Sequence, residues 1–225
     1  MDKTTNGDLY IISTPIGNLD DITLRALSVL KNVDFIICED TRHTGKLLKH
    51  FAISAPMISF HGYSDNRRTE KILNRIEQGE SAALVSDCGT PGISDPGFAL
   101  TSQAIKKKIN LIPIPGASAF LTALQASGSP INQFIYLGFL PIKKGRKTLL
   151  EKLKEEKMTI VFYESVHRIQ KTLEQMIEYF GEDREIIVAR ELTKIYEEFF
   201  RGSIKEATLY FENPKGEFVV IIPAI

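Results

Sequence analysis

Residues 82–97 read AALVSDCGTPGISDPG, an apolar run followed by a loop that contains three glycines and two prolines. Glycine lets the backbone adopt positive φ or approach a ligand closely, and proline stiffens the rest of the loop, so little conformational entropy remains to be lost on binding. The apolar run predicts a strand, which places the loop at a carboxyl end where open α/β sheets bind ligands. Asp95 and Pro96 are predicted to cap and begin the next helix. The alternative interpretation is a strand-to-helix connection without a ligand, although such connections usually need only about two to six residues.

Length and composition limit the classes of protein that the chain can form. Its 225 residues, 43% of them hydrophobic, suffice for one large domain or two smaller ones. Lys plus Arg and Asp plus Glu both total 28, so a nucleic acid would have to be bound by a local basic patch. The two cysteines and four histidines lack the spacing of zinc ligands, and we predict no metal site. The N-terminus has no apolar signal core and no apolar stretch reaches membrane-spanning length, so a cytoplasmic protein that does not contact a membrane is expected.

Strand-like and helix-like segments alternate through the first half of the chain, which predicts an α/β fold with a largely parallel sheet. Asp20 and Asp21 are the predicted cap of the first helix. Strands are expected at 9–13, 33–38, 56–60, 82–86 and 110–114, and helices at 22–30, 45–51, 68–78 and 96–107.

The segment PIPG at 113–116 interrupts this alternation, because its prolines and glycine continue neither a helix nor a strand. We therefore expect an N-terminal domain over 1–115 and a C-terminal α/β domain over 116–225. Consecutive strand-like segments around 191–202 favour some antiparallel pairing, hence a mixed sheet in the second domain. Its helices are expected at 117–126, 147–156, 169–179 and 203–211, and its strands at 134–139, 159–163, 185–189, 195–201 and 217–222.

Four loops follow strand-like runs, and loops at one edge of a parallel sheet should converge. They read STPIGN at 13–18, SDCGTPGISDPG at 86–97, PGASA at 115–119 and YESVHR at 163–168. The sequence contains neither G-x-G-x-x-G nor G-x-x-x-x-G-K-[ST]. An ordinary dinucleotide fold and a P-loop phosphotransferase are therefore disfavoured.

These loops, together with CEDTR at 38–42 and RELTK at 190–194, resemble the tetrapyrrole methylase superfamily, a two-domain α/β class of S-adenosylmethionine-dependent methyltransferases. Within that class they are most similar to the bacterial enzymes that methylate the 2′-hydroxyl of a cytidine in 16S ribosomal RNA. The similarity covers nearly the whole chain, and the combination of GTPGISDPG, PGASA and YESxHR is highly specific.

The resemblance implies that S-adenosylmethionine binds in a cleft between the two domains. It also implies a homodimer that acts on the decoding region of 16S ribosomal RNA or on the small ribosomal subunit. Gly89 and Ile93 can offer backbone groups to the ligand, and Ser118, near a helix N-terminus, can meet a carboxylate, although an ordinary helix start is the alternative for Ser118 and Ala119. The residues that match the cofactor-contact motifs of the family are Pro15, Gly89, Thr90, Ile93, Ser118, Ala119, Glu164 and Leu192.

Methyl transfer to a ribose hydroxyl is an in-line displacement that depends on positioning and on exclusion of water. A general base commonly adds about 10² to 10⁴ in rate. Several candidates have structural alternatives: His61 as a solvated loop histidine, Asp87 in an Asx turn that holds the Gly-rich loop, and Glu39 and Asp40 in an ion pair with Arg42. The candidate bases near the strand ends are Glu39, Asp40, His61, Asp87, Glu164 and Lys194.

A basic segment, KKGRK at 143–147, follows Phe139 and is suited to contact RNA phosphates. The alternatives are a solvated face of a mixed Lys/Glu helix and, for Arg168 and Arg190, buried pairing with Glu164 and Glu191. The candidate RNA-binding residues are Lys143, Lys144, Arg146, Lys147 and Arg168, with Arg67, Arg68 and Arg190 as possible extensions of the same track.

The sequence departs from the family pattern at two points. Val166 stands where the family motif has proline, which should alter stiffness more than chemistry. The sequence ends at Ile225, whereas many ribosomal RNA members carry a further small helical segment. Two other functions fit the same fold: methylation of a tetrapyrrole carbon, and a non-catalytic RNA-binding or ribosome-assembly module.

Overall fold

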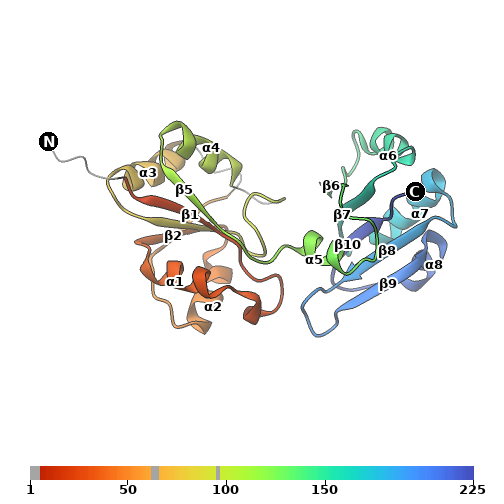
Figure 1. Cartoon of the computed structure of the whole chain (residues 1–225), viewed down its shortest axis with the longest axis horizontal. Coiled ribbons are helices and arrows are strands. Elements are labelled where there is room, and N and C mark those ends of the chain that lie inside the picture. Colours follow the sequence, from red (N-terminus) through yellow and green to blue (C-terminus); the bar gives the residue numbers. More distant parts are fainter. Residues whose placement is uncertain (1–5, 62–65, 95–96) are drawn as a thin grey trace. The chain divides into compact units, whose positions relative to one another are not determined.

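The computed structural model describes residues 6–61, 66–94 and 97–225. The chain divides into two compact units, Met1–Ser118 and Ala119–Ile225, each of which contains its own five-stranded sheet (Figure 1). None of the helices in the described ranges is both long enough and apolar enough to cross a lipid bilayer.

The sheet of the first unit is entirely parallel, as predicted, with the strand order β3-β2-β4-β1-β5. Strand β4 lies between β2 and β1, so the Gly-rich loop leaves the carboxyl edge of the sheet at its centre. The five strands are β1 (Asp8–Ile12), β2 (Phe35–Cys38), β3 (Met57–Ser59), β4 (Ala82–Val85) and β5 (Asn110–Ile114).

Helices cover both faces of this sheet, which explains why strands β2 and β4 are apolar at every position. Leu30 and Leu47, from α1 (Leu24–Asn32) and α2 (Thr41–His50), pack in the cluster on one face. Leu73 and Leu100, from α3 (Asn66–Glu77) and α4 (Phe98–Lys106), pack in the cluster on the other face (Figure 1).

The first residues of two helices differ from those predicted. Asp20 and Asp21 do not cap α1, because they belong to a 3-10 helix, Leu19–Asp21. Thr23 caps α1 instead, and its Oγ1 accepts a hydrogen bond from the Ala26 N–H at 3.1 Å. Asp40 caps α2, which therefore begins at Thr41 rather than at residue 45. The predicted cap Asp95 and helix start Pro96 lie outside the described residues.

The sheet of the second unit is mixed, with the order β6-β7-β10-β8-β9, and this confirms the predicted fold class. Strands β6 and β7 are parallel, and every other neighbouring pair is antiparallel. The strands are β6 (Phe134–Phe139), β7 (Thr159–Ser165), β8 (Glu185–Arg190), β9 (Glu198–Ser203) and β10 (Glu217–Ile222). The helices are α5 (Ala119–Gln125), α6 (Arg146–Lys154), α7 (Ile169–Phe180) and α8 (Ile204–Tyr210).

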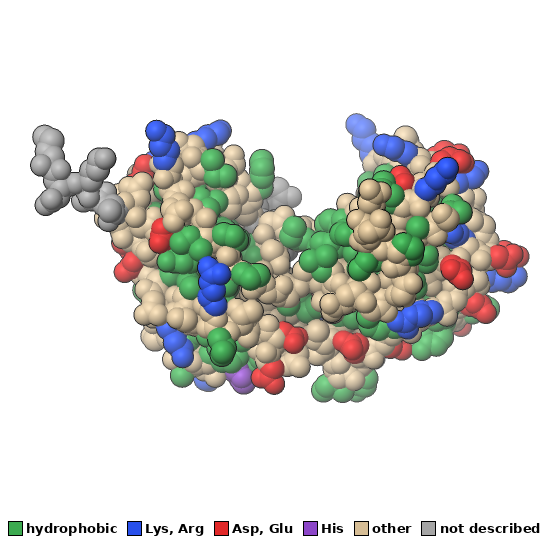
Figure 2. Space-filling view, viewed as in Figure 1, with side chains coloured by type: hydrophobic (Ala, Val, Ile, Leu, Met, Phe, Trp, Pro, Cys, Tyr) green, Lys and Arg blue, Asp and Glu red, His purple; other side chains and the backbone are tan. Residues whose placement is uncertain are grey.

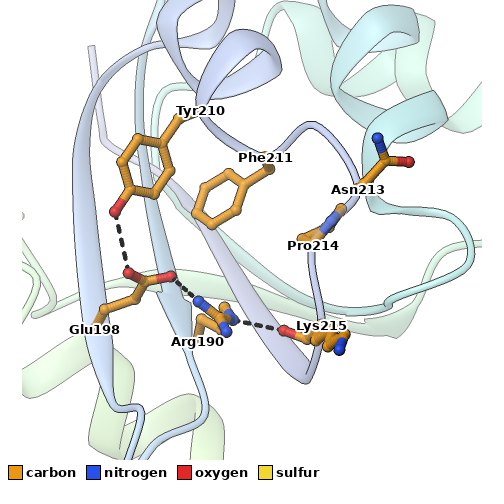
Figure 3. Close-up of a pocket in the computed structure, with 7 residues that line it drawn as sticks. All are labelled: Arg190, Glu198, Tyr210, Phe211, Asn213, Pro214 and Lys215. Atoms are coloured by element: carbon orange, nitrogen blue, oxygen red, sulfur yellow. Dashed lines mark hydrogen bonds and ion pairs between the residues drawn. The ribbon is translucent and has the colours of Figure 1, made fainter.

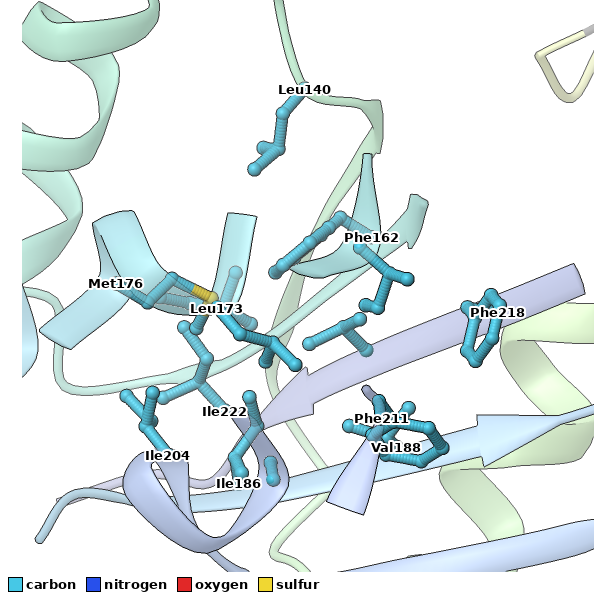
Figure 4. Packing of buried hydrophobic residues seen from close by; sticks show 14 of the residues in the cluster. Leu140, Phe162, Leu173, Met176, Ile186, Val188, Ile204, Phe211, Phe218 and Ile222 are labelled. Carbon is cyan, nitrogen blue, oxygen red and sulfur yellow. The ribbon is translucent and has the colours of Figure 1, made fainter. Parts of the chain in front are cut away.

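One apolar cluster forms the core between this sheet and helices α6, α7 and α8. Figure 4 shows Leu173 and Met176 of α7 close to Phe162 of β7 and Ile222 of β10. This core fixes the carboxyl end of β7, from which the fourth predicted loop emerges.

Candidate active site

Thr14 joins the loop after β1 to the Gly-rich loop after β4. Its backbone N–H donates to the Gly89 carbonyl at 2.8 Å, and the Gly89 N–H donates to the Thr14 carbonyl at 3.1 Å. Thr14 Oγ1 donates to the Ser86 carbonyl at 3.1 Å, and Ser86 Oγ donates to the Gly89 carbonyl at 3.0 Å. These bonds hold the two loops in one conformation and so lower the entropy cost of binding a ligand.

Thr90 joins the Gly-rich loop to the segment after β5. Its Oγ1 donates to the Ala117 carbonyl at 3.1 Å and lies 2.8 Å from Ser13 Oγ. Gly116 permits this approach, because a Cβ there would lie 2.8 Å from Ser13 Cβ. The structure therefore brings three of the four predicted loops together at one edge of the parallel sheet.

Gly89 shapes the loop and does not present free backbone groups. Its φ is +82°, and a Cβ there would lie 3.3 Å from Ile16 Cγ2. Both its N–H and its carbonyl bond to Thr14, and the Ile93 N–H donates to the Thr90 carbonyl at 3.2 Å. The N–H groups of Gly89 and Ile93 are therefore already used within the fold, and the contact of these two residues with a ligand stays a prediction.

The residues of the expected cofactor site are distributed over both units. Within the joined loops of the first unit, Pro15, Gly89 and Ser118 are buried, while Thr90 and Ile93 are half-buried. The second unit contains Ala119, which begins the seven-residue helix α5, and two buried residues, Glu164 and Leu192.

Asp87 connects the ends of β4 and β2, since its Oδ1 accepts a hydrogen bond from the Asp40 N–H at 3.1 Å. This contact replaces the Asx turn that was one interpretation of Asp87. Asp40 caps α2 and pairs with Arg42 at 2.7 Å, which confirms the structural alternative for this carboxylate. Hydrogen bonds from the Arg42 side chain and backbone hold the pKa of Asp40 well below its usual range, so Asp40 is a poor proton acceptor.

Glu39 and His61 lie at the ends of the two neighbouring strands β2 and β3. Ser59 Oγ donates to the Glu39 carbonyl at 3.3 Å and lies 2.9 Å from His61 Nε2. The Glu39 residue is half-buried and His61 is exposed. Both side chains therefore remain candidate bases at the carboxyl edge of the sheet, together with Asp87.

Glu164 is the centre of a buried polar network in the second unit. Its carboxylate accepts hydrogen bonds from the Ser165 N–H at 2.8 Å and from Thr172 Oγ1 at 2.7 Å, and it pairs with Arg168 at 2.7 Å. The side chain of Glu164 is 0% exposed. The carboxylate of Glu164 is therefore used within the fold and is poorly placed to act as a base, while its contact with the cofactor stays a prediction.

Arg146 joins the same network and is the clearest error in the predicted RNA-binding set. Only 7% of Arg146 is exposed, because its guanidinium donates to Gln175 Oε1 at 2.8 Å, to the Pro141 carbonyl at 3.1 Å and to Thr172 Oγ1 at 2.7 Å. Arg168 similarly donates to the Leu140 carbonyl at 3.1 Å. Arg146 and Arg168 therefore hold the loop that precedes α6 and are not free to contact phosphates.

Lys143, Lys144 and Lys147 differ from Arg146 in being exposed. Gly145, with a φ of +82°, turns the chain between the first two lysines and α6. Figure 2 shows both basic and acidic side chains on the surface over α6, as expected for a mixed Lys/Glu helix. The basic surface is therefore concentrated at the start of α6.

Lys194 is held by two carboxylates, Glu191 at 3.0 Å and Glu217 at 2.8 Å. Burial alone would lower the pKa of Lys194, but the hydrogen bonds that it donates to Glu217 and Glu191 outweigh this effect and raise it. Because a general base must be deprotonated, Lys194 is poorly suited to that role. Arg190 pairs with Glu198 rather than with Glu191.

A pocket of about 330 Å³ lies between β8, β9 and the loop after α8 (Figure 3). Arg190 is the one residue of its lining that belongs to a sequence motif, RELTK at 190–194. In Figure 3, Glu198 accepts from both Arg190 and Tyr210, with the Tyr210 hydroxyl at 3.1 Å. The rest of the wall is formed by Phe211, Asn213, Pro214 and Lys215. The guanidinium of Arg190 already pairs with Glu198 and donates a hydrogen bond to the Lys215 carbonyl.

The described parts of the chain contain no group of three His, Cys, Asp or Glu side chains arranged as metal ligands. Residues 13–18, 86–94 and 115–118 contain a single charged side chain, Asp87. Small residues, hydroxyl groups and one carboxylate are suited to a cationic or zwitterionic organic ligand.

The fold and these loops define a class of methyltransferases: residues 8–208 match the family of tetrapyrrole (corrin/porphyrin) methylases, and the chain belongs to that family. Methyltransferases of this family use S-adenosylmethionine. Within the family the chain is similar to proteins named ribosomal RNA small subunit methyltransferase I. The Synechocystis protein is 49% identical over 96% of this chain and 78% of its own length. The Thermotoga maritima protein is 45% identical over 96% of this chain and 98% of its own length.

Solved structures of other family members share the fold at much lower sequence identity. Cobalt precorrin-4 methyltransferase superposes with a TM-score of 0.72 at 19% identity and covers 98% of this chain and 97% of its own. Uroporphyrin-III C-methyltransferase from Thermus thermophilus has a TM-score of 0.67 at 14% identity, with 96% of this chain and 97% of its own covered. These similarities establish the architecture and carry no information about the substrate.

Proposed function

We propose that the protein transfers a methyl group from S-adenosylmethionine to the 2′-hydroxyl of a cytidine in the decoding region of 16S ribosomal RNA. The observation that carries the proposal is identity of 44–49% over nearly the whole chain to proteins named ribosomal RNA small subunit methyltransferase I. The Thermotoga maritima relative, matched over 98% of its length, bears this name without a longer C-terminal part.

The joined loops of the first unit support a site for S-adenosylmethionine. Thr90 and Ile93 are half-buried residues of the Gly-rich loop, and Gly89 packs so closely against Ile16 that a Cβ there would have to displace it. The absence of Lys and Arg from residues 13–18, 86–94 and 115–118 suits a sulfonium cation, which a basic loop would repel. Ser118 is the remaining contact expected in this unit, and Ala119 and Leu192 are those of the second unit.

When bound, S-adenosylmethionine supplies an electrophilic methyl group. The contribution of the chain is to fix the loops in advance, so that Thr14 and Thr90 hold the binding residues without further ordering. A side chain of the protein must accept the proton that the ribose hydroxyl loses. Asp40, Glu164 and Lys194 are engaged in ion pairs or buried hydrogen bonds, so Glu39, His61 and Asp87 are the remaining candidates for this role.

For the RNA, we propose phosphate contacts from Lys143, Lys144 and Lys147. Arg146 and Arg168 would contribute indirectly, since they hold the Pro141 and Leu140 carbonyls at the start of the basic loop. A homodimer and a cytoplasmic location belong to the same proposal, because the resemblance implies the first and a ribosomal substrate implies the second.

Methylation of a tetrapyrrole carbon is the second candidate, because it is the reaction for which the family is named, and the solved family members include precorrin and uroporphyrin methyltransferases. The lower identity of those proteins, 14–19%, makes it the weaker one. A non-catalytic RNA-binding module is the third, and it predicts no binding of S-adenosylmethionine.

Incubation with radiolabelled S-adenosylmethionine tests all three. We expect label in small ribosomal subunits that lack the modification and none in a uroporphyrinogen substrate. Label in the tetrapyrrole alone would establish the second candidate. Calorimetry without detectable S-adenosylmethionine binding at millimolar concentration would establish the third.

A further inference from the structure

A groove of about 620 Å³ runs along the edge of the first unit, between α3 and the edge strand β3. Ile58 of β3 and Ile72 of α3 form its apolar walls. Its four charged lining residues are all cations, namely Arg67, Arg68, Lys71 and Arg75 of α3. None of the family motifs extends into this part of the chain.

The helical repeat concentrates these cations on one side of α3. At about 100° per residue, positions 67, 68, 71 and 75 fall within an arc of about 100°, and Glu70 and Glu77 lie outside that arc. Glu77 forms an ion pair with Lys107, the residue that follows α4. The face toward the groove is therefore basic, although the whole chain has a formal net charge of zero.

The cations differ in how they are neutralised. The Arg75 guanidinium pairs with Glu80 and packs 3.9 Å from the centroid of the Phe35 ring, so it is a fixed structural element. Asp34 also lies near enough to interact electrostatically with Arg75. Arg67 and Lys71 are exposed, and no acidic partner is found for either of them within the described residues. The unneutralised charge of the groove is thus at Arg67 and Lys71.

The chemistry of the lining favours the sugar-phosphate backbone of a nucleic acid over its bases. Lysine and arginine bind phosphate through charge and hydrogen bonds, and a row of such residues follows a repeating anion. The described lining contains no aromatic ring on which a base could stack. Contacts of this kind give affinity and orientation without reading sequence.

We propose that the groove between α3 and β3 binds phosphates of the RNA substrate at a second basic surface, separate in sequence from the lysines that precede and begin α6. The proposal rests on the proposed function, which supplies the RNA. Its role is to orient a large ribosomal substrate, while the loops at the carboxyl edge of the sheet carry the chemistry.

The test compares two charge-reversed variants of the full chain. Arg67→Glu/Lys71→Glu alters the groove, and Lys46→Glu/Lys49→Glu is the matched control, because α2 covers the other face of the same sheet and both lysines are exposed. Binding of a 16S ribosomal RNA fragment is measured by fluorescence anisotropy at several salt concentrations, and folding by thermal melting.

We expect the groove variant to bind RNA about tenfold more weakly at about 0.1 M salt, with a slope of log K against log salt reduced in magnitude by about 1 to 2. The control variant should bind like the unaltered protein, and both should melt at the same temperature as it does. In methylation of ribosomal subunits, the groove variant should raise KM and leave kcat unchanged.

Unchanged RNA affinity in a folded groove variant would overturn the proposal, and so would an equal loss in both variants. If the unaltered protein methylates no ribosomal subunit but binds RNA through the groove, the proposed function fails and the groove assignment stands. If methylation is observed and the groove variant keeps its KM, the groove assignment fails and the proposed function stands.

Discussion

Glu164 and Arg168 form an ion pair at 2.7 Å in which the carboxylate side chain is 0% exposed and the arginine side chain is 23% exposed. Thr172 connects this pair to Arg146, and the two arginines hold the carbonyls of Leu140 and Pro141. A buried carboxylate thus determines the conformation of a loop whose exposed lysines we assign to RNA.

Replacement of this carboxylate should be costly. We expect Glu164→Gln to lower the free energy of unfolding by about 3 kcal/mol, because it leaves Arg146 and Arg168 without their buried counter-charge. Urea denaturation measures the change. Glu182→Gln is the matched control, since its pair with Lys205 is exposed, and it should leave stability nearly unchanged. Equal stability of Glu164→Gln and the unaltered protein would show that the network is not a structural anchor.

A methyl group at Gly89 should interfere with the cofactor site beyond its effect on the backbone. We expect Gly89→Ala to abolish detectable binding of S-adenosylmethionine in calorimetry, because its Cβ enters the space near Ile16 and the Ala117 carbonyl. Gly128→Ala is the control, because Gly128 has a similar φ of +79° and a Cβ there meets nothing within 4 Å, so this variant tests the positive φ without the contact. Binding by both variants would remove the Gly-rich loop from the cofactor site.

The sequence predicted the alternating elements well, because strands such as β5, β6 and β10 are continuous apolar runs bounded by polar or turn residues. The sequence did not show which basic residues are exposed and which are buried. Arg146 stands in a run of exposed lysines yet turns inward, since its partners Gln175 and Thr172 are contributed by α7, far along the chain. The cap of α1 could not be predicted either, because Thr23 and Asp21 are both good capping residues. Only the position of the helix shows that Thr23 is the one that caps it. The contacts between Thr14, Gly89 and Thr90 follow from strand order, which the motifs alone do not specify.

Lys194 should stabilise the folded protein and should not serve as the catalytic base. Because its pKa is raised in the folded state, its contribution is fully present below the unfolded pKa of about 10.4 and is lost as pH rises through the folded pKa. We expect Lys194→Gln to lower the free energy of unfolding by about 1 kcal/mol at neutral pH, and the difference from the unaltered protein to shrink as the pH rises above about 10.4. The measurement is urea denaturation from pH 7 to 11. A loss of kcat with unchanged stability would restore Lys194 as a candidate base.

The exposed lysines of the basic loop should control RNA affinity. We expect the triple variant Lys143→Gln/Lys144→Gln/Lys147→Gln to weaken binding of a 16S RNA fragment and to lower the magnitude of the salt slope by about 2 to 3. The matched control replaces the exposed lysines Lys152, Lys154 and Lys157 by glutamine and should change neither quantity. Fluorescence anisotropy at several salt concentrations measures both the RNA affinity and the salt slope. An unchanged slope in the first variant would exclude these lysines from the phosphate contacts.

The most direct test of the central claim is to map the modified nucleotide. Small ribosomal subunits that lack the modification are incubated with the protein and labelled S-adenosylmethionine, and the digested 16S RNA is analysed by mass spectrometry. We predict one added methyl group on the ribose of a cytidine in the decoding region. Subunits that remain unlabelled while the protein binds S-adenosylmethionine, or a methyl group found on a base, would contradict the assignment.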